Sequence, residues 1–299
     1  MKRKVIVASL IFTSFGLMLG SCGGTESDDQ DINVIDTLVT PEVEIDPNQS
    51  GITYSVPTPN ELFDIIKLQG GEQQINLVNP LENSDNYIDQ KSKSLNFGIY
   101  SADIAYLSCF GIGTDFLKYF KKIEELGTDL GISGAFDADL MSRIESNESN
   151  TDSLFLISND SYYESYEYLE QNDKGVELSL IMAGGYIESL YIICNLVDTY
   201  SADNPIITKV GDQKVVLESL IDFIASYADN VLVEETINDL LGLSDVFENN
   251  MEFVESSSDV KSNDEGKLTV TGGGSFKMNE AAFVAIKNKA NELREKFTK

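Results

Sequence analysis

The stretch LSLIMAGGYIESLYIICNLV, Leu178 to Val197, is apolar on nearly every side of a helix. Helices of this composition lie either at the centre of a bundle or in a membrane. Glu188 and Asn195 fall within the stretch, and a carboxylate in the middle of a membrane is costly. The stretch therefore predicts a central buried helix. Its Ala183–Gly185 segment would let a neighbouring helix approach closely, because glycine has no Cβ.

Apolar residues recur at helical spacing through most of the chain that flanks this stretch. Thr58, Pro59 and Glu61 have the sequence of a helix start, with a cap, a first-turn proline and a capping-box acid. The spacing indicates an all-α domain over 52–299, a multi-helix bundle of about eight to ten helices. The expected helices are 58–69, 84–92, 95–110, 113–127, 133–147, 152–171, 175–199, 212–228, 232–250 and 279–298.

One segment near the C-terminus departs from helical spacing. ESSSDVKSNDEG, residues 255–266, is polar and predicts a loop. KLTVTGGGSFKM, residues 267–278, alternates apolar and polar residues on both sides of three glycines. This pattern predicts a small β-hairpin, or an extended excursion, just before the last helix.

The N-terminus has the three parts of a signal peptide, predicted over 1–21. Lys2, Arg3 and Lys4 precede the apolar run Val5–Leu19, which is shorter than the roughly 20 residues of a membrane-spanning helix. Leu19-Gly20-Ser21-Cys22 resembles a bacterial lipobox, in which the chain is cut before the cysteine and the thiol carries diacylglycerol. The resemblance implies lipid attachment at Cys22. The alternative is an ordinary signal peptide with an incidental cysteine.

Residues 22–51 predict an acidic, flexible tether, since Gly23 to Ser50 contain eight acids and no Lys or Arg. The acidic cluster Glu26–Asp29 resembles the export signal of surface lipoproteins in Bacteroidota. It implies an outer-membrane protein that is exposed on the cell surface, with a periplasm-facing orientation as the alternative. Triplets centred on Thr37 and Ser153 look like the O-glycosylation motif of the same phylum.

Composition excludes several classes of function. The 50 acids and 21 bases give a net charge of −29, which argues against a nucleic-acid partner. The chain has no histidine, so it cannot form a Ser-His-Asp or Cys-His triad or a histidine zinc site. No cofactor or metal site is indicated. Cys109 and Cys194 lie in apolar patterns that favour buried free thiols, with a disulfide as the alternative in an oxidising envelope.

Two carboxylates in apolar helical surroundings are the strongest candidates for a site. A buried carboxylate must be paired, hydrogen-bonded or protonated, and Glu188 and Asp103 both fit this description. If they face one cavity with Tyr100, Tyr106 and Tyr186, the five side chains could bind a ligand or a cation. We favour the alternative that each acid makes structural hydrogen bonds.

A run of tyrosines at 162–168 could form a surface for a carbohydrate or a protein partner, because tyrosine combines apolar area with a polar tip. Half-buried helix packing is the more common role of such residues. The pattern does not decide between the two roles.

The segments LNFGIYSADIAYLSCF, LIMAGGYIESLYIICNLV and TGGGSFKMNEAAFVAIKNKANELREKF together resemble a group of Bacteroidota outer-membrane lipoproteins. The resemblance extends over most of the mature chain. It implies a lipid anchor and a helical fold, and it brings no activity or site residue with it.

Three functions remain open at this point. The first is a membrane-anchored, non-catalytic envelope lipoprotein, an accessory or scaffold subunit that binds a protein partner. The second is a lipoprotein that binds a glycan or another small ligand. The third is a carboxylate-dependent hydrolase, which would need two acids about 5–10 Å apart in an open cleft.

Overall fold

The computed structural model describes residues 58–299 except 112, 137–138, 255–258, 263–267 and 272–274. Residues 52–299 form a unit separate from 1–51. The signal peptide, Cys22, the tether and Thr37 lie outside the described residues.

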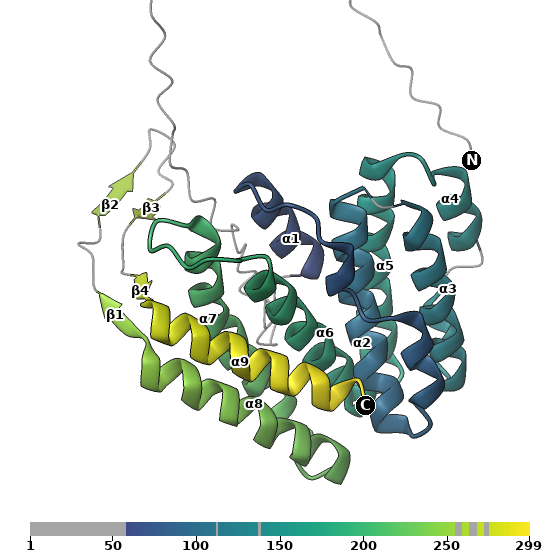
Figure 1. Cartoon of the computed structure of the whole chain (residues 1–299). Helices are drawn as coiled ribbons and strands as arrows, with labels where there is room; N and C mark the ends of the chain where they lie inside the picture. Colours follow the sequence, from purple (N-terminus) through teal and green to yellow (C-terminus); the bar gives the residue numbers. More distant parts are fainter. Residues whose placement is uncertain (1–57, 112, 137–138, 255–258, 263–267, 272–274) are drawn as a thin grey trace, which may run out of the picture. The chain divides into compact units, whose positions relative to one another are not determined.

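The described part confirms an all-α multi-helix bundle (Figure 1). Its α-helices are α1 (Pro59–Leu68), α2 (Gln90–Cys109), α3 (Gly113–Asp129), α4 (Leu140–Ser146), α5 (Thr151–Gln171), α6 (Gly175–Asn195), α7 (Pro205–Ala225), α8 (Val231–Asn250) and α9 (Glu280–Phe297).

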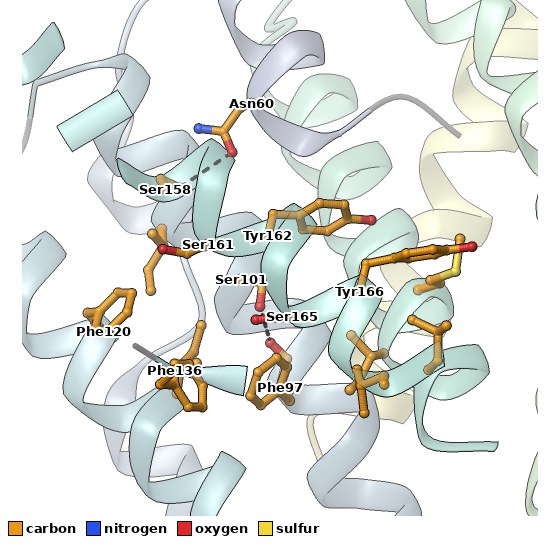
Figure 2. Close-up of a pocket in the computed structure, with 16 residues that line it drawn as sticks. Asn60, Phe97, Ser101, Phe120, Phe136, Ser158, Ser161, Tyr162, Ser165 and Tyr166 are labelled. Carbon is orange, nitrogen blue, oxygen red and sulfur yellow. Dashed lines mark hydrogen bonds between the residues drawn. The ribbon is translucent and has the colours of Figure 1, made fainter. Parts of the chain in front are cut away.

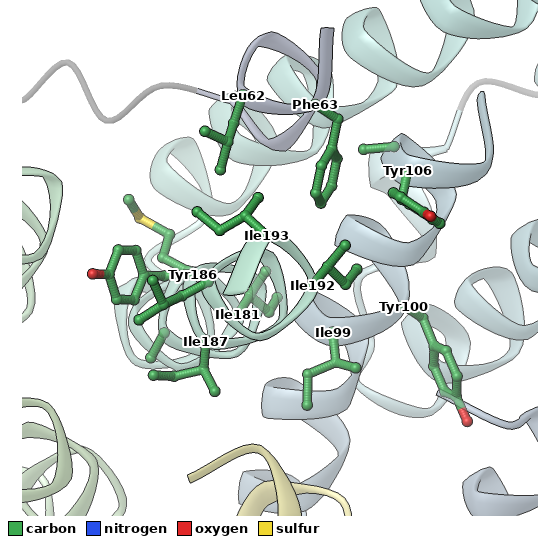
Figure 3. Packing of buried hydrophobic residues seen from close by; sticks show 14 of the residues in the cluster. Leu62, Phe63, Ile99, Tyr100, Tyr106, Ile181, Tyr186, Ile187, Ile192 and Ile193 are labelled. Carbon is green, nitrogen blue, oxygen red and sulfur yellow. The ribbon is translucent and has the colours of Figure 1, made fainter. Parts of the chain in front are cut away.

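Helix α6 is the centre of the bundle, as its composition predicts. It contacts α1, α2, α5, α7, α8 and α9. In the described part of the chain it is the one helix long and apolar enough to cross a membrane, yet 83% of its most apolar window is buried by the other helices. Figure 3 shows Leu62 and Phe63 of α1 above Ile193 of α6. Burial on all sides explains why the helix lacks a polar face.

The close approach predicted from the glycines is confirmed where α2 and α6 cross. A Cβ built on Gly184 would overlap the carbonyl oxygen of Leu95, and one built on Gly98 would overlap the carbonyl oxygen of Ile181. The two backbones are therefore in direct contact, and only glycine fits at these two positions.

Several helix boundaries differ from the predicted ones because of caps. Asp89 accepts a hydrogen bond from the backbone N–H of Ser92, so α2 starts at Gln90, and a 3₁₀ segment at Leu81–Asn86 takes the place of the predicted helix at 84–92. Asn204 caps α7, which starts at Pro205 and not near 212. The predicted helix at 133–147 is shorter, a 3₁₀ turn at Ser133–Ala135 followed by α4.

The segment before α9 forms two short pairs of antiparallel strands. Strand β1 (Glu252–Val254) pairs with β4 (Ser275–Lys277), and β2 (Asp259–Ser262) pairs with β3 (Leu268–Thr271), both antiparallel. The prediction of a loop over 255–266 is therefore wrong for β2. The small β-hairpin or extended excursion predicted before the last helix is confirmed, although β3 pairs with β2 and not across the three glycines. The four residues of β2 are too few to show the alternation of a strand.

Candidate functional site

The two acids singled out in the sequence meet between α2, α6 and α9. Glu188 of α6 is fully buried and accepts two hydrogen bonds from the Arg294 guanidinium of α9, from Nε at 3.1 Å and from Nη2 at 3.3 Å. The guanidinium also lies over the ring of Tyr191, 4.7 Å from its centroid. Arg294 therefore balances the charge of Glu188 inside the core, and its planar, bidentate geometry suits that role.

Asp103 of α2 completes this group. Its Oδ2 accepts a hydrogen bond from the backbone N–H of Asn79 at 3.0 Å, and the nearby carboxylate of Glu188 acts on its pKa. Its Oδ1 is buried without a donor. Two ionised carboxylates offer only acceptors, so they can share a hydrogen bond only if one of them carries a proton.

The surroundings assign that proton to Asp103. Burial and the nearby charge of Glu188 raise the pKa of Asp103 well above its ordinary value. Burial also raises the pKa of Glu188, but Arg294 acts against that shift. A protonated Asp103 can donate to ionised Glu188, which pairs with Arg294. We call Asp103, Glu188, Arg294 and Asn79 the acid network.

Asn79 anchors the irregular segment between α1 and α2 to this network. Besides donating to Asp103, it accepts at its backbone carbonyl a hydrogen bond from the Tyr119 hydroxyl at 2.8 Å. Its side chain donates to the Tyr87 hydroxyl at 3.0 Å and accepts from the side-chain amide of Asn83 at 2.7 Å. Asn79 is thus satisfied by four neighbours, as a fully buried polar residue must be.

The three tyrosines predicted beside the acids occupy different places. The pKa of Tyr100 is raised above its ordinary value. Burial is the largest cause, and the neighbouring Tyr87 and Asp103 contribute less. Tyr106 accepts a hydrogen bond from the backbone N–H of Gln74 at 2.6 Å, and Tyr186 donates to the carbonyl of Gln213 in α7 at 3.0 Å. The five predicted residues therefore do not surround one cavity.

The remaining candidate residues that the structure describes are Cys109, Cys194 and Ser153. Cys109 and Cys194 are both buried free thiols, and burial raises the pKa of each to about 12. The prediction of free thiols agrees with the structure, and the alternative disulfide does not form, because the two side chains lie on α2 and α6 without meeting. Ser153 lies half-buried in the first turn of α5. Its backbone N–H donates a hydrogen bond to the side chain of the capping residue Asn150.

The structure also contains a cavity that the sequence patterns did not indicate. It has two adjoining chambers, a smaller one of about 50 Å³ and a larger one of about 150 Å³. Side chains of α2, α3, α5 and α6 line the smaller chamber, and side chains of α1, α2, α6 and α7 line the larger one. Ser101, Tyr162, Ile181 and Met182 line both. We call the two chambers together the α5 cavity, and Figure 2 shows residues that line the smaller chamber.

The inward face of α5 explains why this space exists. Ser158, Ser161 and Ser165 are buried and recur at helical spacing where larger side chains would fill the core. Tyr162 and Tyr166, from the predicted tyrosine run, also line the smaller chamber, so that run is half-buried packing here (Figure 2). The 158–161–165 spacing of small residues was the available signal.

Comparison with protein-family models, curated proteins and solved structures finds no match for this chain. Within the described residues, no group of three or more Cys, Asp and Glu side chains could hold a metal ion. The function must therefore be argued from the acid network, the α5 cavity and the exposed surface.

Proposed function

We propose that the chain is a membrane-anchored, non-catalytic envelope lipoprotein of the outer membrane, an accessory or scaffold subunit that binds a protein partner. The lipobox-like sequence at Cys22 and the acidic tether support the anchor. The net charge of −29 favours a partner with a basic surface, because opposite charges steer association. The resemblance to Bacteroidota lipoproteins supports the same location.

The acid network favours a non-catalytic role. A carboxylate-dependent hydrolase needs two acids that face its substrate in an open cleft. Asp103 and Glu188 are both fully buried and are engaged by Asn79, by each other and by Arg294. These contacts give both acids a structural role, because they join α2, α6 and α9 to the segment before α2.

A groove between α1 and α5 carries the proposal of a protein partner. It has a volume of about 220 Å³ and is lined in part by Asp64, Asp152, Phe155 and Leu156, and by Lys67, whose Nζ donates to the carbonyl of Cys109. Leu156 is 59% exposed, whereas Phe155 is packed against the core. An apolar side chain between two acids fits a partner that presents an apolar residue flanked by Lys or Arg.

The test is affinity capture from native outer membranes after mild crosslinking, with tagged wild-type chain and two variants. Leu156→Lys places a charge in the groove, and Ile88→Lys places the same charge on a residue that is 82% exposed elsewhere. We expect one partner to be enriched by the wild type and by Ile88→Lys and to be lost with Leu156→Lys. Equal capture by all three, or recovery of the bare protein, would overturn the proposal.

A Cys22→Ala chain tests the anchor separately. It should leave the membrane fraction, and the wild type should stay in it with a lipid-modified N-terminal cysteine in its mass spectrum. An unmodified Cys22 in membrane-bound wild type would contradict lipid attachment, whatever the outcome of the capture.

A further inference from the structure

The α5 cavity goes beyond the proposed function, because it has the features of a binding site for a small molecule. One of its polar side chains is unpartnered. Ser165 is 9% exposed, lines the smaller chamber and makes no hydrogen bond to another described residue. Buried hydroxyl groups are normally hydrogen-bonded. Ser165 therefore has a free hydroxyl that can bind a group entering the chamber.

The lining selects an uncharged ligand. None of the residues that line the smaller chamber is charged. In the larger chamber, Glu61 accepts a hydrogen bond from the backbone N–H of Thr58, and Lys209 is paired with Asp212 at 2.9 Å. The smaller chamber offers no countercharge, and the Glu61 carboxylate in the larger chamber repels an anion, so burial of an anionic ligand is costly.

Size and shape favour a single ring. A cavity of about 150 Å³ in a protein core is large enough to bind benzene, and the larger chamber has about this volume. Aromatic rings already pack on one another beside the smaller chamber, where Phe136 lies 6.1 Å from Phe97 and 6.2 Å from Phe120 between ring centroids. A ligand ring in the larger chamber would pack beside the ring of Tyr162, which lines both chambers.

The hydroxyl groups supply a polar anchor for such a ring. Ser101, which lines both chambers, donates to the carbonyl of Phe97 at 2.8 Å and keeps its oxygen lone pairs as acceptors. The hydroxyls of Ser165 and Tyr162 make no hydrogen bond to other described residues and can donate or accept. A hydroxyl or carbonyl on the ligand would thus be recognised from α2 and α5 together (Figure 2).

We propose that the α5 cavity binds a small neutral molecule that consists of an aromatic or alicyclic ring with one hydrogen-bonding substituent. The ring lies in the larger chamber against Ile181 and Met182. The substituent reaches past Ser101 to the hydroxyl of Ser165 in the smaller chamber. No covalent step is involved.

The test is calorimetric titration of the full mature chain with phenol, toluene and benzoate as probes. Phenol should bind at least tenfold more tightly than benzoate, because the site excludes charge. Ser165→Ala should weaken the binding of phenol by about three- to tenfold, because one hydrogen bond is lost. The same variant should leave the binding of toluene unchanged. Ser101→Leu, at the junction of the chambers, should weaken both neutral probes at least tenfold.

Ser146→Leu is the matched control, since Ser146 is exposed at the end of α4, and it should bind as the wild type does. If Ser101→Leu fails to fold by circular dichroism, Tyr162→Trp adds bulk at the same junction and should have the same effect. Absence of phenol and toluene binding at millimolar concentration would overturn the proposal. So would benzoate binding as tight as phenol, or neutral-probe binding that neither junction variant weakens.

Discussion

The acid network and the inward face of α5 are two polar regions of one core, and they differ in how fully their groups are used. In the acid network, Asp103 accepts a hydrogen bond from Asn79 and Glu188 pairs with Arg294, and only Oδ1 of Asp103 has no donor. On α5, Ser165 is buried and unpartnered beside open space. The difference indicates that the conspicuous acids hold the helices together, whereas the inconspicuous serines leave room for a ligand.

Helix spacing produces this difference. The glycines at the α2–α6 crossing bring two backbones into contact, and Glu188 lies fully buried on the same helix as Gly184. Helix α5 instead faces α2, α3 and α6 with serines, whose short side chains do not fill the gap. A closed region should respond to every change of charge or volume, and an open one should tolerate both.

The largest effect should come from breaking the ion pair of the acid network. Arg294→Met removes the partner of a fully buried Glu188 and should lower the free energy of unfolding by about 3–5 kcal/mol, which urea denaturation would measure. Lys289→Met on the same helix removes a surface ion pair and should cost less than about 1 kcal/mol. Equal losses for the two variants would show that Arg294 has no special role.

A smaller effect should come from adding volume at the crossing. Gly184→Ala forces a methyl group into the backbone of Leu95 and should destabilise the fold by about 1–3 kcal/mol. At Gly242 in α8, an added Cβ would meet only the end of the Lys289 side chain, at 3.8 Å. Gly242→Ala should therefore stabilise by about 0.5–1 kcal/mol through helix propensity, and a similar gain at Gly184 would refute the tight crossing.

The third effect should be a change in pH dependence, which is small per pH unit and accumulates over the range. Asn at position 103 keeps both hydrogen bonds of a protonated Asp103, accepting from Asn79 and donating to Glu188. Because the raised pKa of Asp103 makes the folded wild type retain a proton that the unfolded chain releases, the contribution of Asp103 to stability should fall as the pH rises above about 4.

Asp103→Asn should lack this loss, which is at most about 1.4 kcal/mol per pH unit. Thermal unfolding from pH 4 to pH 8 would measure the stability of the two chains. The stability of Asp103→Asn relative to the wild type should increase as the pH rises. Asp103→Ala is the control, since it loses both hydrogen bonds and should be less stable throughout. Parallel curves for wild type and Asp103→Asn would contradict a raised pKa.

Much of the fold could be predicted because buried helix positions appear in the sequence as a pattern of apolar residues. The all-round apolar character of Leu178–Val197 gave the central helix, and its glycines gave the close crossing. Short segments left no such record. The four residues of β2 and the early start of α2 depend on pairing and on the Asp89 cap, which apolar spacing does not detect.

The site could be predicted only in part. Glu188 and Asp103 stood out as acids in apolar surroundings, but their partners did not. Arg294 resembles a surface residue at the edge of the apolar stripe of α9, although it lies four residues after the buried Ala290. Asn79 belongs to an irregular segment without periodicity. The serines of α5 were missed because small polar residues in a helix usually face solvent.

The most direct test of the acid network is infrared spectroscopy of the folded chain at neutral pH. We predict the carbonyl band of a protonated carboxylic acid in the wild type, and we predict its loss in Asp103→Asn while Glu188 stays ionised beside Arg294. A wild-type spectrum without that band, or a band that persists in Asp103→Asn, would contradict the assignment of the proton to Asp103.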